Sequence, residues 1–252
     1  MENPLTLLLC GALSTEENEI NEVLAHLASS IENATEEINS LDLLSDKKVS
    51  LYGPFLGRSV LELAATALIA RLDPFRLLLL RERQKQPDFE LDKPHKSSIR
   101  WQGDVMADKV SNLWDEKSLA NPTRALLGDY YTKLIWLGSF TNLLDRSEEI
   151  SGDEWLGDLR KKDSQRFCSE VRADFSSLYS ELSKGIHHEI VIPAAAAFDK
   201  ATTKELIRKV LYNVSTLGLI VSLIEHATNR PDMTAAFEAY RKVQKMEIFR
   251  EH

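Results

Sequence analysis

The sequence predicts an all-α fold, a multi-helix bundle. Apolar residues recur at steps of three and four along most of the 252 residues, which is the period of an amphipathic helix. Ile190 to Ile192 is the one run with the composition of a strand, and a lone strand cannot pair its backbone groups. A hydrophobic content of 43% supplies enough material for a buried core.

The net charge and the two cysteines bear on nucleic-acid binding, metal binding and disulfide formation. A net charge of -8 argues against a chain that coats nucleic acid through bulk electrostatics, although a local basic patch remains open. Cys10 and Cys168 lie far apart and match no metal-ligand spacing. We therefore expect two reduced thiols, no structural disulfide and a cytoplasmic location.

The apolar run Leu5 to Leu13 is too short for a membrane span and follows Glu2 rather than a basic segment, so we expect an N-terminal arm instead of an export signal. No other run reaches the roughly 18 apolar residues that a membrane helix needs. We expect no membrane association.

Residues 1–52 are expected to hold this arm and one amphipathic helix. Ser14 to Glu17 has the spacing of a capping box, and the apolar positions Ile20 to Ile38 follow it with helical period. Gly53-Pro54 then predicts the start of the helical bundle, residues 53–252, and the whole chain is expected to form one compact domain.

Within the bundle, residues 55–72 are so apolar that they predict a central helix, which Asp73-Pro74 ends or restarts. Residues 87–100 read as a long loop, a lid or a contact surface. Further helices are expected over 101–114, 122–146 and 164–183, with a linker at 147–153. Thr202 to Glu205 predicts the cap of a helix through Ile224, and Arg230-Pro231-Asp232 predicts the start of the last helix.

Polar chemistry gathers at residues 179–189. If the helix continues through Gly185, then Tyr179, Ser183 and His187 lie along one face, with Lys184 beside them. No other segment of the sequence collects polar side chains in this way.

Arg58 and Glu62 stand four residues apart in the most apolar helix. They could line an interior cleft together with Ser183, Lys184 and the two histidines His187 and His188, and hold a phosphate or polarise a nucleophile. They could equally form an internal salt bridge or a slightly exposed helix edge. Both interpretations remain open from the sequence.

His187 and His188 admit three interpretations. Adjacent histidines on a helix point about 100° apart and lack a zinc or di-iron spacing, so we expect no metal. One of them could act as a general acid or base, with Lys184 stabilising charge on a phosphate. They could also cap a helix that ends at Gly185.

A hydrophobic helix bearing Arg58 and Glu62, followed by Tyr179-x-x-Leu-Ser-x-x-x-His187, resembles the HEPN superfamily of helical bundles, common in prokaryotic defence and toxin systems. The resemblance covers Phe55 to His226. Active members are metal-independent ribonucleases in which an arginine precedes a histidine by a few residues and the pair faces its counterpart across a homodimer. Here Lys184 or Ser183 stands at the arginine position, and lysine lacks the planar fork that holds a phosphate at two points.

The expectation that follows is a non-catalytic or weakly catalytic accessory subunit of a larger bacterial complex. The resemblance implies a protein partner, such as an ATPase or nuclease encoded nearby, and a role in anti-phage defence. The rival is a homodimeric ribonuclease in which His187 or His188 is the general base and Lys184 stabilises the phosphate of RNA. Arg58, Glu62, Tyr179 and Ser183 would support either site, and we expect no cofactor.

Overall fold

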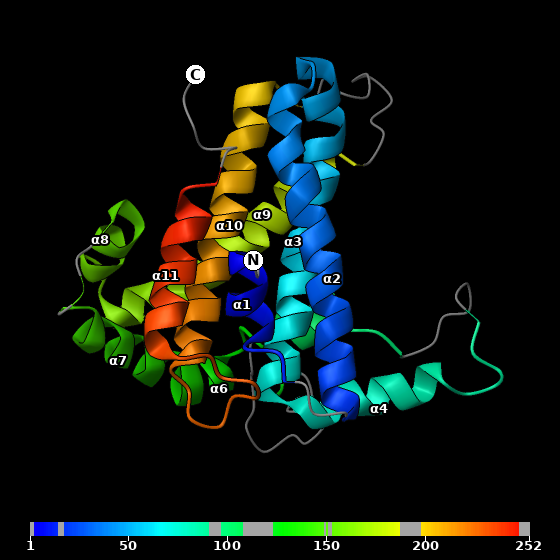
Figure 1. Cartoon of the computed structure of the whole chain (residues 1–252), viewed down its shortest axis with the longest axis vertical. Helices are drawn as coiled ribbons and strands as arrows, with labels where there is room; N and C mark the ends of the chain where they lie inside the picture. Colours follow the sequence, from blue (N-terminus) through cyan, green and yellow to red (C-terminus); the bar gives the residue numbers. More distant parts are fainter. Residues whose placement is uncertain are drawn as a thin grey trace.

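The chain folds around two long helices, α3 and α10, with the other helices packed about them (Figure 1). The computed structural model describes residues 3–14, 18–90, 97–107, 123–148, 150, 153–186 and 198–246. Within these ranges the chain forms helices and turns and no strand, which confirms the all-α prediction. The elements are α1 (Pro4–Cys10), α2 (Glu19–Ser40), η1 (Leu41–Leu43), α3 (Asp46–Leu72), α4 (Pro74–Gln84), η2 (Trp101–Val105), α6 (Asp129–Tyr131), η3 (Thr132–Trp136), α7 (Leu137–Ser147), α8 (Glu154–Arg160), α9 (Ser164–Lys184), α10 (Lys200–Ser222) and α11 (Met233–Gln244).

Helix α3 begins well before the predicted Phe55 and carries Pro54 in its interior. A proline removes one helical hydrogen bond and normally ends a helix. Here the helix continues through the proline, and Pro54 packs so closely on Gly185 that a Cβ at Gly185 would lie 2.5 Å from the proline side chain. The segment expected over residues 1–52 is therefore continuous with the bundle, and the boundary at Gly53 falls inside a helix.

Two predicted helix starts are displaced. Helix α2 begins after Asn18, whose side chain accepts a hydrogen bond from the backbone of Asn21, rather than at Ser14. Helix α10 begins after Asp199, which accepts from the backbone N–H of Thr202 at 2.7 Å. In both helices the residue just before the first helical residue is an Asn or Asp, and its side chain accepts a hydrogen bond from the backbone of the first turn. Asn and Asp are at least as effective helix caps as serine or threonine.

The N-terminal arm is helix α1, and Leu5, Leu8 and Leu9 are fully buried. The buried Arg71 of α3 donates hydrogen bonds to the carbonyl oxygens of Leu8, at 2.8 Å, and Thr228, at 3.0 Å. These bonds hold the arm against the centre of the bundle. The burial of its leucines agrees with the N-terminal arm that the apolar run predicts.

Residues 101–105 do not start a regular helix. Gly103 has φ of 98°, and the segment forms the π-type turn η2. The backbone N–H groups of Leu126 and Leu127 donate to the carbonyls of Asp104 and Val105, both at 2.9 Å, which fixes this turn against the start of the next helical segment. Residues 108–114 of the predicted helix lie outside the described residues.

The helix predicted from Pro122 begins at Asp129 and runs through α6, η3 and α7 to Ser147. Trp136 and Phe140 of this stretch are buried in the core. Leu134 of η3 is 76% exposed. The predicted linker joins α7 to α8, a short helix that the sequence analysis did not anticipate.

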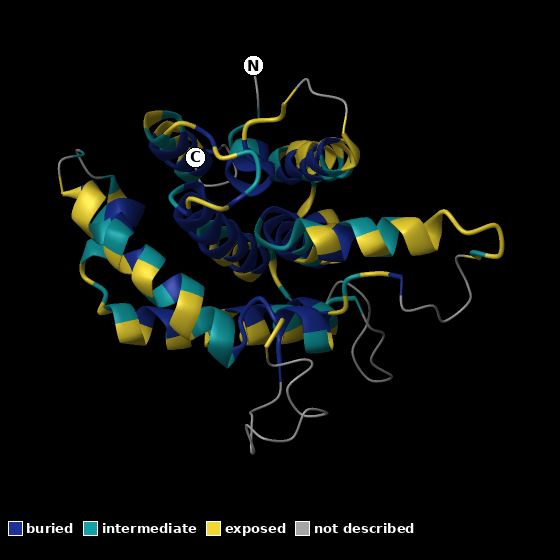
Figure 2. Ribbon diagram, turned by 90° about the horizontal axis from the view of Figure 1, so that it is seen from below, coloured by how far each residue is buried: buried dark blue, intermediate teal, exposed yellow. Residues whose placement is uncertain are grey.

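Figure 2 shows the buried residues where the helices face one another, and exposed residues along the outward faces and toward the end of α4. Cys10 and Cys168 are both buried and free. No helix in the described part of the chain has the length and apolar character needed to cross a membrane.

Candidate functional site

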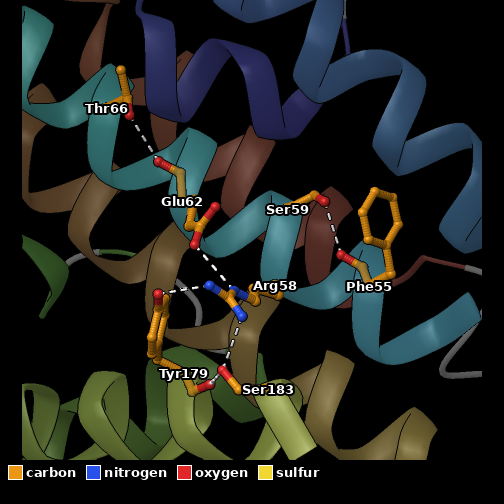
Figure 3. A network of polar contacts seen from close by, with 7 residues as sticks. All are labelled: Phe55, Arg58, Ser59, Glu62, Thr66, Tyr179 and Ser183. Carbon is orange, nitrogen blue, oxygen red and sulfur yellow. Dashed lines mark hydrogen bonds and ion pairs between the residues drawn. The ribbon is translucent and has the colours of Figure 1, made fainter. Parts of the chain in front are cut away.

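Four residues that the sequence singled out come together between α3 and α9 (Figure 3). The guanidinium of Arg58 donates to the hydroxyl of Tyr179 at 2.7 Å, to the hydroxyl of Ser183 at 3.1 Å and to the carboxylate of Glu62 at 3.1 Å. Its central carbon also lies 4.4 Å from the centre of the Tyr179 ring. The convergence expected from the two i, i+4 pairs is therefore present, and we call these four residues the Arg58 network.

The local sequence explains this convergence. Arg58 and Glu62 share one face of α3, while Tyr179 and Ser183 share one face of α9. The helices approach closely at Gly57, where an added Cβ would lie 3.1 Å from the side chain of Leu182. The space for a side chain at position 57 is therefore small.

The Arg58 side chain is 22% exposed and that of Glu62 is 47% exposed. The geometry matches the interpretation in which Arg58 and Glu62 form an ion pair at a partly exposed helix edge. Because each nitrogen of the guanidinium already donates to a protein oxygen, the network is arranged to hold α3 against α9.

Lys184 lies apart from this network. Its ammonium is 2.7 Å from the carboxylate of Glu181, and its side chain is 57% exposed. Helix α9 ends at Lys184 with Gly185 as its C-cap, as the capping interpretation expects. His187 and His188 lie outside the described residues, so their catalytic or capping role stays a prediction.

Beside the network lies a groove of about 1240 Å³. It is lined by α2, α3, α4, residues 97–102, Val105 and Tyr179. Typical small-molecule sites occupy roughly 300–1,000 Å³. Glu62 and Tyr179 belong to both features, so one side of the groove is held by the Arg58 network.

The groove has a partly apolar lining drawn from several elements. The side chains that supply it, without being fully buried, are Val23 and Leu27 of α2, Leu63 of α3, Leu80 of α4 and Ile99 of the loop segment. Such side chains can still release water when a partner covers them.

The aromatic residue Trp101 lines the groove and is buried. Its indole stacks on the ring of Tyr179, with 4.2 Å between ring centres and 12° between the ring planes. The Arg58 network thereby fixes Tyr179, and Tyr179 supports Trp101. The loop segment at residues 97–102 is thus connected to the centre of the bundle.

Ion pairs connect α2 to α4 on the other side of the groove. Arg81 of α4 pairs with Glu19, at 2.7 Å, and with Glu22. Lys85 lies 3.3 Å from the same Glu19 carboxylate. Figure 1 shows α4 extending away from the base of the bundle beside the lower end of α2, so these pairs hold an otherwise projecting helix.

Sequence reasoning found the Arg58 network and missed the groove, apart from the expectation that residues 87–100 form a lid or contact surface. Residues 97–100 of that loop do line the groove, while 91–96 lie outside the described residues. Leu77 and Leu80 of α4 also line the groove. Nothing in their spacing shows that they face α2.

Among the described residues, no group of three or more His, Cys, Asp or Glu side chains is arranged to hold a metal ion. Comparison with protein-family models, with curated proteins and with solved structures finds no match to this chain.

Proposed function

We propose that this protein is a helical accessory subunit of a larger bacterial complex, and that it binds a segment of a partner protein in the groove between α2, α3 and α4. The groove carries the proposal. It is larger than a typical small-molecule site, and its partly buried apolar side chains come from several separate elements.

The walls favour a helical segment over an extended one. An extended peptide gains affinity by pairing with the free edge of a sheet, and the described residues contain no strand to offer one. Helices α2, α3 and α4 satisfy their backbone groups internally and present side chains. Recognition in this groove therefore rests on apolar side chains inserted between the helices.

The Arg58 network supports this proposal over the ribonuclease. The guanidinium of Arg58 already donates hydrogen bonds to Glu62, Tyr179 and Ser183. Lys184 is paired with Glu181. A phosphate would have to displace these contacts. The resemblance to the HEPN superfamily is the basis for an anti-phage role and for a partner such as an ATPase or nuclease encoded nearby.

The test is affinity purification of the tagged protein from its bacterial host, followed by size exclusion and an assay with added RNA. The proposal expects a stoichiometric protein partner and no RNA cleavage by the purified subunit. A partner-free homodimer that cleaves RNA, and loses this activity when His187 and His188 are replaced by alanine, would establish the ribonuclease instead.

A further inference from the structure

We propose that the occupant of the groove is an amphipathic helix with an acidic residue beside its apolar face, and that Arg100 binds that carboxylate. This inference rests on the proposed function of the groove. It adds the chemistry of the partner, which follows from how the charged groove residues are paired.

Four charged residues line the groove, and three of them already form ion pairs within the protein. Glu62 is paired with Arg58, and Glu22 is paired with Arg81. Within the part of the chain that the structure describes, the fourth, Arg100, has no ion pair. Its hydrogen bonds are made by its backbone: the N–H donates to the carboxylate of Asp104 at 3.0 Å, and the carbonyl accepts from the N–H of Asp104 at 3.1 Å. The charge left for a partner is thus a single positive one.

Arg100 is placed to act together with the apolar lining. It is exposed and lies between Ile99, which packs against the core, and Trp101, which is buried. A helix that inserts apolar side chains toward Leu63 and Leu80 would run past this segment. An acidic residue next to those side chains would then meet the guanidinium, whose planar fork suits a carboxylate.

A basic residue at the same place on the partner helix would weaken binding. A lysine or arginine at this place would face Arg100, and the two acidic residues of the described groove lining, Glu22 and Glu62, already have partners. Like charges brought together at an interface weaken binding and so select against basic helices.

The experiment uses the full-length protein and a phage-displayed library of helical peptides with randomised surface positions. Peptides are selected on the wild-type protein after removal of those that also bind the Leu80→Glu variant. Selected peptides are then synthesised, and their affinities are measured for wild type, for Arg100→Glu and for Lys47→Glu. Lys47 is an exposed lysine near the start of α3 outside the groove, so it controls for the change in net charge.

The inference expects enriched Asp or Glu next to the apolar positions and an affinity about three- to tenfold lower for Arg100→Glu, with no change for Lys47→Glu. A peptide with that acid replaced by lysine should bind Arg100→Glu better than wild type. Groove-dependent peptides that are not helical, carry no acidic preference or bind Arg100→Glu equally well would overturn the inference and leave the proposed function standing. Recovery of no groove-dependent peptide would overturn both.

Discussion

Arg58 of α3 donates a hydrogen bond to the hydroxyl of Tyr179 of α9, with 2.7 Å between nitrogen and oxygen. The same tyrosine ring stacks on Trp101, which lines the groove. Arg58 therefore acts on the groove through Tyr179 without lining it. In our account Arg58 positions one side of a protein-binding site.

The first prediction concerns this network. Arg58→Ala removes the bonds to Glu62, Tyr179 and Ser183, and should lower the free energy of unfolding by about 2 kcal/mol, as measured by urea denaturation. Tyr179→Phe keeps the ring on Trp101 and loses one acceptor, so it should cost about 1 kcal/mol.

Both variants should show the loss in the isolated protein, without RNA or partner. If Arg58→Ala has the stability of the wild type, the network does not hold α3 against α9. If it keeps that stability and abolishes an RNA-cleaving activity, Arg58 belongs to a catalytic site.

The sequence predicted the Arg58 network because each half of it is local. The i, i+4 spacing places Arg58 beside Glu62 and Tyr179 beside Ser183. Because α3 is mostly apolar, a charged residue such as Arg58 within it needs a polar partner. The groove could not be predicted in this way. It depends on how α4 returns beside α2 and on where Gly103 turns the chain, and these are long-range relationships that a helical period does not contain.

Close helix packing gives the second prediction. At Gly218 of α10, an added Cβ would lie 2.8 Å from the carbonyl oxygen of Leu8 in α1. Gly218→Ala should therefore lower the free energy of unfolding by about 1–3 kcal/mol, since neither backbone can move freely.

Gly138 of α7 is the matched control, because a Cβ there meets nothing within 4 Å. Gly138→Ala should raise the free energy of unfolding by about 0.5–1 kcal/mol through better helix propensity. Equal effects of the two substitutions would show that α1 does not pack on α10 at this distance.

The third prediction is a loss of stability at alkaline pH. Burial raises the pKa of the Cys10 thiol from about 9 to about 12, partly offset by the charge of Arg71. Below about pH 9 the thiol is protonated in both the folded and the unfolded chain. Above it, the unfolded chain loses the proton first, so this thiol should lower the free energy of unfolding by about 1.4 kcal/mol per pH unit.

Cys10→Ala should make the alkaline slope of stability shallower, even if it lowers stability at every pH through the lost volume. Urea denaturation at a series of pH values from neutral to alkaline measures both slopes. Parallel slopes for wild type and variant would contradict a buried, protonated Cys10 in the folded state.

The fourth prediction concerns the ion pairs between α2 and α4. Hydrogen bonds from Lys85 and Arg81 lower the pKa of the Glu19 carboxyl, so their ion pairs persist as the pH falls until it passes that lowered pKa. Glu19→Gln should speed amide hydrogen exchange in α4 at neutral pH, and high salt should have the same effect on the wild type.

Glu181→Gln is the control, because Glu181 pairs with Lys184 on the same helix. It should leave exchange in α4 unchanged. Exchange in α4 that is indifferent to both Glu19→Gln and salt would mean that apolar contacts alone hold this helix.

Some sequence predictions failed for reasons of tertiary structure. Pro54 was expected to mark the start of a helix, but α3 begins at Asp46 and continues through the proline, which packs on Gly185. The roles of His187 and His188 remain predictions that mutation can test.

The most direct test of the account compares two neighbouring leucines of α4. Leu80 lines the groove, whereas Leu79 is 44% exposed and does not. Each is replaced by glutamate, folding is checked by circular dichroism, and the affinity for the partner purified with the wild-type protein is measured by titration calorimetry. We predict that Leu80→Glu lowers the affinity at least about tenfold, because it places a charge among apolar contacts, and that Leu79→Glu leaves it unchanged. Equal affinity of the folded Leu80→Glu variant and the wild type, or a loss confined to Leu79→Glu, would show that the partner binds elsewhere.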